Sequence, residues 1–357
     1  MKKIVFAIND LQGSGAERYV TTLYSAFTEM GHECHIICFK KVVELSLDSE
    51  LRIHHFQPPS WYSAIPRKQR DVLISRKLDQ FVLDKIGTPD LLLSNLMSSD
   101  RLFCHSRLPN VHLVVHINFS ADHLAGLSEK EKNKKLKRLN RIYLKKPCVC
   151  VGQGVKDNFD EVMKPSIPSV RIYNPVDVDF LHNSSTEYAV EPKDYIVHIG
   201  KFKPVKRHDL LLNAYKHSGV SNPVVLLGKG KTEAEINALA HKLDINDKVV
   251  FGGFQSNPYP YLSNARLMVV SSDYEGFSIA ILEAIALGIP VVSTDCPSGP
   301  REILPPQNLV PVDDPAQLGD KIKEAIATPE LYKVPFSDVF SAEYAATEYM
   351  KLAGKEA

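Results

Sequence analysis

The chain has 357 residues, of which 44% are hydrophobic and 24% are charged, and its formal net charge is +1 at pH 7. This length predicts two domains, because single hydrophobic cores seldom grow beyond roughly 250–300 residues, and the balanced charge excludes the overall basic character of many nucleic-acid-binding proteins. No stretch is apolar for long enough to span a membrane, and the short apolar start is too brief for a signal peptide. We therefore expect a globular protein that stays in the cytoplasm.

The first half of the chain alternates short apolar runs with helical patterns. A buried strand is predicted from Ile4 to Ile8, and a helix from about Ala16 to Met30. Between them, Gly13 and Gly15 let the backbone approach a ligand, although the loop lacks the full G-x-G-x-x-G spacing. Further strands are predicted at residues 35–39, 52–56, 91–95 and 112–117. This alternation predicts a doubly wound parallel sheet.

Two basic stretches interrupt this half, at residues 61–70 and 129–146. The second has the pattern of a basic helix with one apolar side, and two interpretations of it stay open. It is either a solvated surface helix packed on its domain or a surface for anionic lipid headgroups, with Trp61 and Tyr62 at the membrane interface. The six cysteines form no CxxC pair, which predicts buried free thiols.

A polar stretch from Leu181 to Pro192 is typical of an interdomain linker, and a second alternating half follows it. Its first strand ends at Gly200, and Lys201 and Lys206 come from the next loop, where point charges can neutralise a diphosphate. Strands at 224–227 and 248–251, a helix at 232–243 and a capped helix at 341–352 complete the pattern.

Residues 266–294 predict a strand, a loop, a helix and a second strand. Glu275 lies in the loop at the strand's carboxyl end, where ligands of open α/β sheets bind, and Glu283 lies just over one turn into the helix. The free amides at the helix start favour an anion. Spacing alone also fits a carboxylate that only complements the helix dipole and one that is only solvated.

The string Glu275-Gly-Phe-Ser-Ile-Ala-Ile-Leu-Glu283 resembles the E-x7-E signature of retaining glycosyltransferase family 4, whose members have the GT-B fold. Residues 295–304 resemble a segment of bacterial members that build lipopolysaccharide, capsule or lipid-linked oligosaccharide. The resemblance implies two doubly wound Rossmann-like domains that face one another across a cleft. Residues 1–178 would bind the acceptor and residues 179–340 the nucleotide sugar, with a helix in 341–357 packing back on the first domain.

The resemblance also implies roles for single residues. His116, Glu275 and Lys206 would act in catalysis. The donor would be bound by Gly15, Lys201, Lys206, Phe254, Glu275, Gly276, Phe277, Ser278, Ile279 and Glu283. Three departures from the family pattern stand out: Ser14 replaces a glycine, Lys201 replaces an arginine, and Asn118 stands where an aspartate usually follows the histidine.

The resemblance implies the transfer of a hexose or N-acetylhexosamine from a nucleotide sugar, expected to be a UDP-sugar, to a lipid-linked glycan acceptor, with retention of configuration. No cofactor or metal is expected, since Asp177-Val-Asp179 at the domain join is the nearest Asp-x-Asp. Expected partners are the donor, the acceptor and the anionic inner face of the cytoplasmic membrane, and not nucleic acid. A GT-B nucleotide-sugar 2-epimerase and a non-catalytic nucleotide-sugar binding protein are the alternatives.

Overall fold

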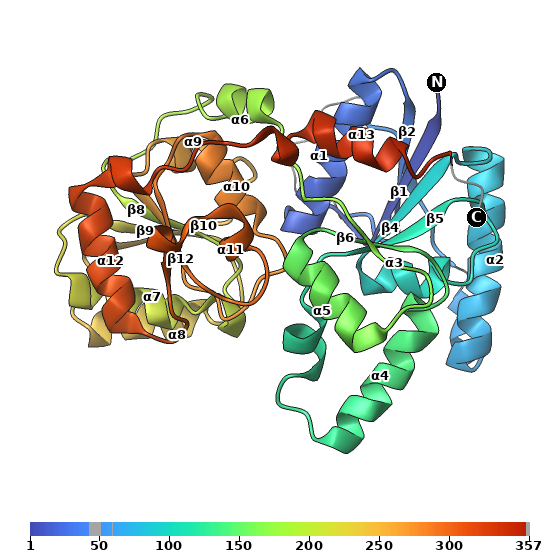
Figure 1. The fold of residues 1–357 in the computed structure, drawn as a ribbon, viewed down its shortest axis with the longest axis horizontal. Coiled ribbons are helices and arrows are strands. Elements are labelled where there is room, and N and C mark those ends of the chain that lie inside the picture. Colours follow the sequence, from blue (N-terminus) through green and yellow to red (C-terminus); the bar gives the residue numbers. More distant parts are fainter. Residues whose placement is uncertain (43–50, 59, 355–357) are drawn as a thin grey trace. The chain divides into compact units, whose positions relative to one another are not determined.

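A computed structural model describes residues 1–42, 51–58 and 60–354. The chain forms two compact units, the first of residues 1–175 with 341–357 and the second of residues 176–340. Each unit holds one sheet whose strands are all parallel, with helices packed around it (Figure 1). This confirms the prediction of two doubly wound α/β domains.

The sheet of unit 1 has seven strands in the order β3-β2-β1-β4-β5-β6-β7. They are β1 (Lys3–Ile8), β2 (Glu33–Cys38), β3 (Ile53–His55), β4 (Leu91–Asn95), β5 (Val111–Val115), β6 (Cys148–Cys150) and β7 (Val170–Arg171). The central strands are apolar on both faces, as expected of a parallel sheet covered by helices on both sides. The strand order reverses between β1 and β4, which creates a switch point where the loops after these strands diverge.

The helices of unit 1 are α1 (Gly15–Glu29), α2 (Arg67–Lys85), α3 (Leu96–Phe103), α4 (Glu129–Tyr143), α5 (Gln153–Met163) and α13 (Ala342–Met350). Helix α1 begins with a capping box between Ser14 and Glu17 and ends before Gly31, which has a φ of 79°. Helix α13, from the end of the chain, packs on α1, and the Tyr19 hydroxyl donates to the Tyr349 hydroxyl at 2.5 Å. Short turns of helix occur at Ser60–Ala64 (η1) and Ser120–Leu124 (η2).

The sheet of unit 2 has six strands in the order β10-β9-β8-β11-β12-β13, so its switch point lies between β8 and β11. They are β8 (Ile196–Ile199), β9 (Val224–Leu227), β10 (Val249–Gly253), β11 (Leu267–Val270), β12 (Val291–Thr294) and β13 (Leu309–Val310). Buried side chains of these strands form one core with those of α7 and α12.

The helices of unit 2 are α6 (Val178–Ser184), α7 (His208–Ser218), α8 (Glu233–Lys242), α9 (Tyr259–Ser263), α10 (Ile279–Ala286), α11 (Pro300–Ile303) and α12 (Pro315–Ala327). Four short 3₁₀ turns are η3 (Pro204–Lys206), η4 (Pro306–Asn308), η5 (Pro329–Tyr332) and η6 (Asp338–Phe340). The stretch from Leu181 to Pro192, predicted as a linker, instead lies inside unit 2 and begins within α6. Its polar composition reflects a short helix with only Leu181 and Ser184 buried.

The two basic stretches differ from each other in the structure. Helix α4 is amphipathic, and its apolar side is packed inside unit 1 through Leu139, Ile142 and Tyr143. The prediction that Tyr62 lies at a membrane interface is wrong, because its side chain is only 5% exposed where η1 packs on α2. The side chain of Trp61 lies outside the described part of the structure.

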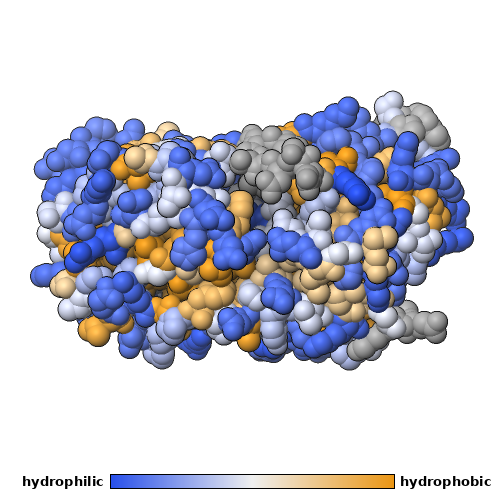
Figure 2. Space-filling model, turned by 90° about the horizontal axis from the view of Figure 1, so that it is seen from above, coloured by the Kyte–Doolittle hydropathy of each residue, from blue (hydrophilic) through white to orange (hydrophobic). Residues whose placement is uncertain are grey.

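Within the described ranges, no helix combines the length and the apolar character needed to cross a membrane. Figure 2 shows hydrophilic residues with hydrophobic patches between them, as is usual for a protein of this composition. All six cysteines are buried and free, as predicted. Burial raises the pKa of the Cys34 thiol to about 11 and that of Cys38 to about 12, so both thiols stay protonated and unreactive at neutral pH.

Candidate functional site

Of the charged residues predicted to bind a donor, Lys201, Lys206 and Glu275 come from two loops at the switch point of unit 2. Strands β8 and β11 are neighbours in the sheet, and the loops after them begin at the same edge because the strands are parallel. The first loop carries Lys201 and Lys206, and the second carries Glu275. Their meeting follows from the strand order, since residues about 70 positions apart in the chain share one edge.

Lys206 and Glu275 form the central ion pair of this edge. The Lys206 ammonium donates to Glu275 Oε1 at 2.6 Å, and the side chains are 25% and 11% exposed. The Ser272 hydroxyl donates to the same oxygen at 2.7 Å. Both of these bonds use Oε1, and no hydrogen bond to Glu275 Oε2 is seen among the described residues. The pair therefore offers a cation and a carboxylate side by side.

Arg207, next to Lys206, connects these two loops and the loop after β13. Its guanidinium donates to Asp209 at 3.1 Å, to Asp273 at 2.8 Å and to Asp313 at 2.8 Å, so it joins the loops after β8, β11 and β13. Its backbone is left-handed, with φ at 46° and ψ at 49°, a conformation that costs a non-glycine residue free energy. These carboxylates raise the pKa of the Arg207 guanidinium further above its ordinary value, and its charge is permanent.

The segment between Glu275 and helix α10 is held by a second loop. The Glu275 amide donates to the Pro297 carbonyl at 3.2 Å. Gly299 has a φ of 86°, and a Cβ there would lie 3.2 Å from the Gly276 carbonyl oxygen and 3.4 Å from the Ser278 nitrogen. Ser278 is the N-cap of α10, but its side chain does not bond to the helix. Only a glycine at 299 fits this close approach, which fixes the backbone at the start of α10.

Glu283 is 2% exposed and accepts from the Tyr259 hydroxyl at 3.0 Å. This burial argues against a merely solvated helix carboxylate, because buried carboxylates are found with partners. Phe277 and Ile279 are buried, at 4% and 7% exposure, and Gly276 is partly exposed.

Phe254 follows β10, and the Lys229 ammonium lies 4.6 Å from the centre of its ring. Lys201, directly after β8, is partly exposed, and no hydrogen bond of its side chain is seen among the described residues. The predicted residues of unit 2 thus fall on three loops and one helix at the same edge of the sheet, with a direct contact between Lys206 and Glu275.

The predicted residues of unit 1 lie at its own switch point. Gly15 is the exposed first residue of α1, which follows β1, while the φ of 87° belongs to Gly13. His116 follows β5 directly, and its Nε2 lies 2.9 Å from Asn95 Oδ1 at the end of β4. Desolvation lowers the pKa of His116 to about 3, so the ring is neutral at physiological pH.

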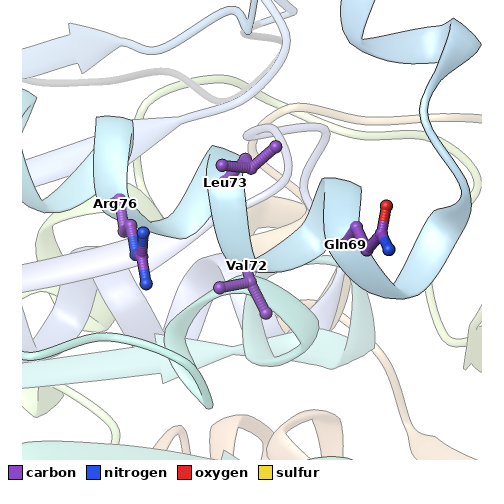
Figure 3. A pocket seen from close by; sticks show the side chains of 4 residues that line it. All are labelled: Gln69, Val72, Leu73 and Arg76. Atoms are coloured by element: carbon purple, nitrogen blue, oxygen red, sulfur yellow. The ribbon is translucent and has the colours of Figure 1, made fainter.

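Two further features of the described residues bear on ligands. No group of three His, Cys, Asp or Glu side chains is placed to hold a metal ion within the described ranges. A surface hollow on α2 is lined by Gln69, Val72, Leu73 and Arg76, as Figure 3 shows, and none of these is a predicted site residue.

Sequence reasoning missed Arg207, Tyr259, Ser272 and Asn95. Each is a polar residue that contacts or adjoins a predicted one. A signal for Asn95 was available, because it is the last residue of a predicted strand and polar residues at that edge often serve ligands. Tyr259 gave no comparable signal, since its partner Glu283 is 24 positions away.

Two sequence families match the chain. The family described as "Glycosyltransferase Family 4" matches residues 13–180, and the family described as "Glycosyl transferases group 1" matches residues 183–335. The two matches follow one another along the chain and cover most of both units.

Curated relatives carry related names. An N-acetylgalactosaminyltransferase of Campylobacter jejuni, acting on N-acetylgalactosamine-N,N'-diacetylbacillosaminyl-diphospho-undecaprenol, is 30% identical over 165 residues, which are 45% of each chain. The lipopolysaccharide 1,6-galactosyltransferase of Salmonella typhimurium is 27% identical over 167 residues, 44% of this chain and 45% of that one. The matched region thus spans about half the length of these relatives.

Solved structures share the fold over nearly the full length. A variant of TarM from S. aureus, in complex with fondaparinux, alpha-GlcNAc-glycerol and UDP, has a TM-score of 0.74 at 14% identity, covering 99% of this chain and 100% of that one. HepE of Anabaena, in complex with UDP and glucose, has a TM-score of 0.71 at 17% identity, covering 98% and 95%. At identities this low, the TM-scores establish the fold alone, and this fold is GT-B, as predicted.

The brace at Arg207 makes a prediction about stability. Arg207→Ala removes the ion pairs and keeps a side chain in the left-handed region, whereas Arg207→Gly removes the same ion pairs and relieves that backbone. We expect the glycine variant to be more stable than the alanine variant by about 1 kcal/mol, measured by urea unfolding.

Lys216, which is exposed in the last turn of α7, is the matched control. There the order should reverse, with alanine more stable than glycine by about 1 kcal/mol, because a helix interior disfavours glycine. The same order of alanine and glycine at both positions would contradict the left-handed assignment of Arg207.

Proposed function

The chain belongs to the family 4 glycosyltransferases and has the GT-B fold, and on that premise we propose that it transfers a hexose or N-acetylhexosamine from a UDP-sugar to a glycan acceptor, with retention of configuration. The observation that carries the proposal is the Lys206–Glu275 pair at the switch point of unit 2. The donor is a sugar linked to a diphosphate, so its site needs a cation for the diphosphate and, next to it, a hydrogen-bond acceptor for the sugar hydroxyls. The Lys206 ammonium and the Glu275 carboxylate supply these two groups side by side.

Charge on the leaving diphosphate is the main electrostatic cost of the reaction. The Lys206 ammonium can stabilise it, with Lys201 as a second cation from the same loop. The free backbone amides at the start of α10 lie at the positive end of the helix dipole, and both favour the binding of an anion. Such groups stabilise a leaving diphosphate without a metal, so we propose that the reaction requires none.

The remaining donor contacts follow from the same edge of unit 2. A Glu283 carboxylate that Tyr259 already orients suits the two hydroxyls of a ribose. The half-exposed Phe254 offers an aromatic edge for the nucleobase. Glu275 Oε2 is the acceptor we assign to a hydroxyl of the transferred sugar. From unit 1, we assign Gly15 to the diphosphate and His116 to the transfer step.

The acceptor and the pathway rest on the relatives. One is named for a saccharide on diphospho-undecaprenol and another for lipopolysaccharide, which supports a lipid-linked or lipopolysaccharide glycan in cell-surface polysaccharide synthesis. The names of these relatives also favour transfer over the alternative of a nucleotide-sugar 2-epimerase. The orientation of His116 by Asn95 and of Glu275 by Ser272 argues against a non-catalytic binding protein, because binding alone does not require such fixed side chains.

Such an acceptor lies at a membrane, and we propose that unit 1 approaches an anionic surface through α4. Its exposed residues include Lys134, Lys137 and Arg138, while its apolar side is buried inside the unit. The attraction would therefore be electrostatic, without insertion of the helix into the lipid.

The first test is a thermal-shift screen of UDP, GDP, ADP and their sugars, with and without EDTA. We expect stabilisation by UDP and by one UDP-sugar, unchanged by EDTA, and release of UDP only when an acceptor is added. Release of UDP without an acceptor would favour the epimerase, and no response to any nucleotide would contradict the proposed function.

Variants of the donor residues should separate binding from transfer. Glu283→Ala and Lys206→Ala should each weaken UDP binding by about 1.5–3 kcal/mol, the range for hydrogen bonds to charged groups, measured by calorimetry. Glu275→Gln should instead leave UDP affinity equal or higher, because Lys206 loses a competing carboxylate, while the transfer rate falls. The exposed Lys216→Ala is the control for affinity. A Glu275 variant that loses UDP affinity and rate equally would refute the division of roles.

Flotation with vesicles tests the membrane surface. The wild-type protein should float with phosphatidylglycerol vesicles, not with phosphatidylcholine vesicles, and should dissociate as salt rises. Lys134→Glu with Lys137→Glu and Arg138→Glu should abolish flotation, since each basic residue near the surface contributes about 1 kcal/mol. Glutamates at the exposed Lys216 and Lys242 of unit 2 are the control. Flotation that ignores the α4 charges would rule this surface out.

A further inference from the structure

His116 is held by a buried asparagine whose orientation can be deduced. Asn95 has no exposed surface, and its side chain has three neighbours within hydrogen-bonding distance. Its Nδ2 lies 3.0 Å from the Leu93 carbonyl oxygen and 3.4 Å from that of Ala7, and its Oδ1 lies 2.9 Å from His116 Nε2. Since the two backbone carbonyls can only accept, the amide NH₂ must face them. The amide oxygen must then face the histidine.

This orientation decides which ring nitrogen of His116 carries the proton. An amide oxygen accepts only, so Nε2 must be the donor, and in the neutral ring Nδ1 then keeps its lone pair. We propose that Asn95 is a positioning residue that locks His116 in the neutral Nε2–H tautomer, so that Nδ1 is a fixed hydrogen-bond acceptor. No partner for Nδ1 is seen among the described residues.

The surroundings of the pair resist any change of this arrangement. The ring of Tyr19 meets that of His116 edge-on, with centroids 4.9 Å apart, and its hydroxyl is tied to Tyr349 of α13. On the other side of Asn95, the Ser94 hydroxyl donates to the buried Asp100 at 2.7 Å. Asn95 is also the N-cap of α3, so its backbone is fixed at the junction of β4 and the helix. The amide is therefore held by its hydrogen bonds to two carbonyls, and the histidine ring is held by Asn95 and Tyr19.

The tautomer determines the kind of ligand that His116 accepts. A lone pair on Nδ1 takes a hydrogen bond from a hydroxyl, and it repels the oxygens of a phosphate or carboxylate. Desolvation keeps the ring neutral, so the acceptor persists through the physiological range of pH. Together with the proposed function, on which this step rests, the ligand is a sugar hydroxyl and not the diphosphate.

The tautomer can be measured without any assay of activity. In protein labelled with ¹⁵N-histidine, a difference spectrum between wild type and His116→Gln isolates the two ring nitrogens of His116. We expect a protonated Nε2 and an unprotonated Nδ1 in the free protein at neutral pH. A protonated Nδ1 would overturn the inference while leaving the proposed function intact.

Substitution of Asn95 tests whether it fixes the tautomer. Asn95→Leu removes the acceptor, so the signals of His116 should shift toward a mixture of tautomers and the transfer rate should fall roughly 10- to 100-fold, with UDP affinity unchanged.

Asn308 supplies a matched control. It is also fully buried, and its Nδ2 also donates to two backbone carbonyls, those of Val291 and Tyr332, but no hydrogen bond to a histidine is seen for it within the described ranges. Asn308→Leu should lower stability to a similar degree and leave the His116 signals unchanged. If Asn95→Leu leaves them unchanged too, Asn95 does not set the tautomer. If the tautomer is confirmed but the wild type transfers no sugar to any acceptor, the proposed function fails and the assignment of the proton stands.

Discussion

The contact between Lys206 and Glu275 is the constraint on which the candidate site depends. Two charged side chains from separate loops can meet at 2.6 Å only because β8 and β11 are neighbours that end at the same edge. The strand order that makes them neighbours also makes their loops diverge, which opens space for a ligand at that point. Arg207 then holds the loops together, and its left-handed backbone is tolerated because three carboxylates fix its side chain. Topology and charge therefore act on the same few residues.

The ion pair also explains how the Lys206 ammonium is stabilised at this edge when no ligand is bound. An unpaired ammonium at 25% exposure would be partly desolvated, and Glu275 offsets that cost in the absence of a ligand. A diphosphate brings more negative charge than one carboxylate, so it competes well for Lys206 and leaves Glu275 to turn to a neutral hydroxyl. In the proposed function, the pair is a resting arrangement that the donor rearranges. Ser272 keeps Glu275 in place while this happens, because its hydroxyl bonds to the same oxygen.

Much of the fold could be predicted from the sequence, because apolar β-branched runs of four or five residues have few alternatives to a buried parallel strand. The strands predicted at 91–95 and 224–227 have those bounds in the structure. The polar run after Leu181 has no such periodicity, so the short helix α6 could not be predicted from it. Among the site residues, the motif identified Glu283 but not its burial, since the hydroxyl of Tyr259 reaches it from another element. Partners of this kind are set by tertiary packing, which a single sequence does not display.

The two units place different chemistry at the same topological position. At the switch point of unit 2 the neighbouring loops present a lysine and a glutamate, whereas in unit 1 a neutral histidine is fixed by an amide. An aspartate in place of Asn95 would turn its second oxygen toward the carbonyls of Leu93 and Ala7, which can only accept, so the amide is the side chain that suits both these carbonyls and the histidine. In the proposed tautomer, this amide leaves Nδ1 of His116 as an acceptor for a hydroxyl.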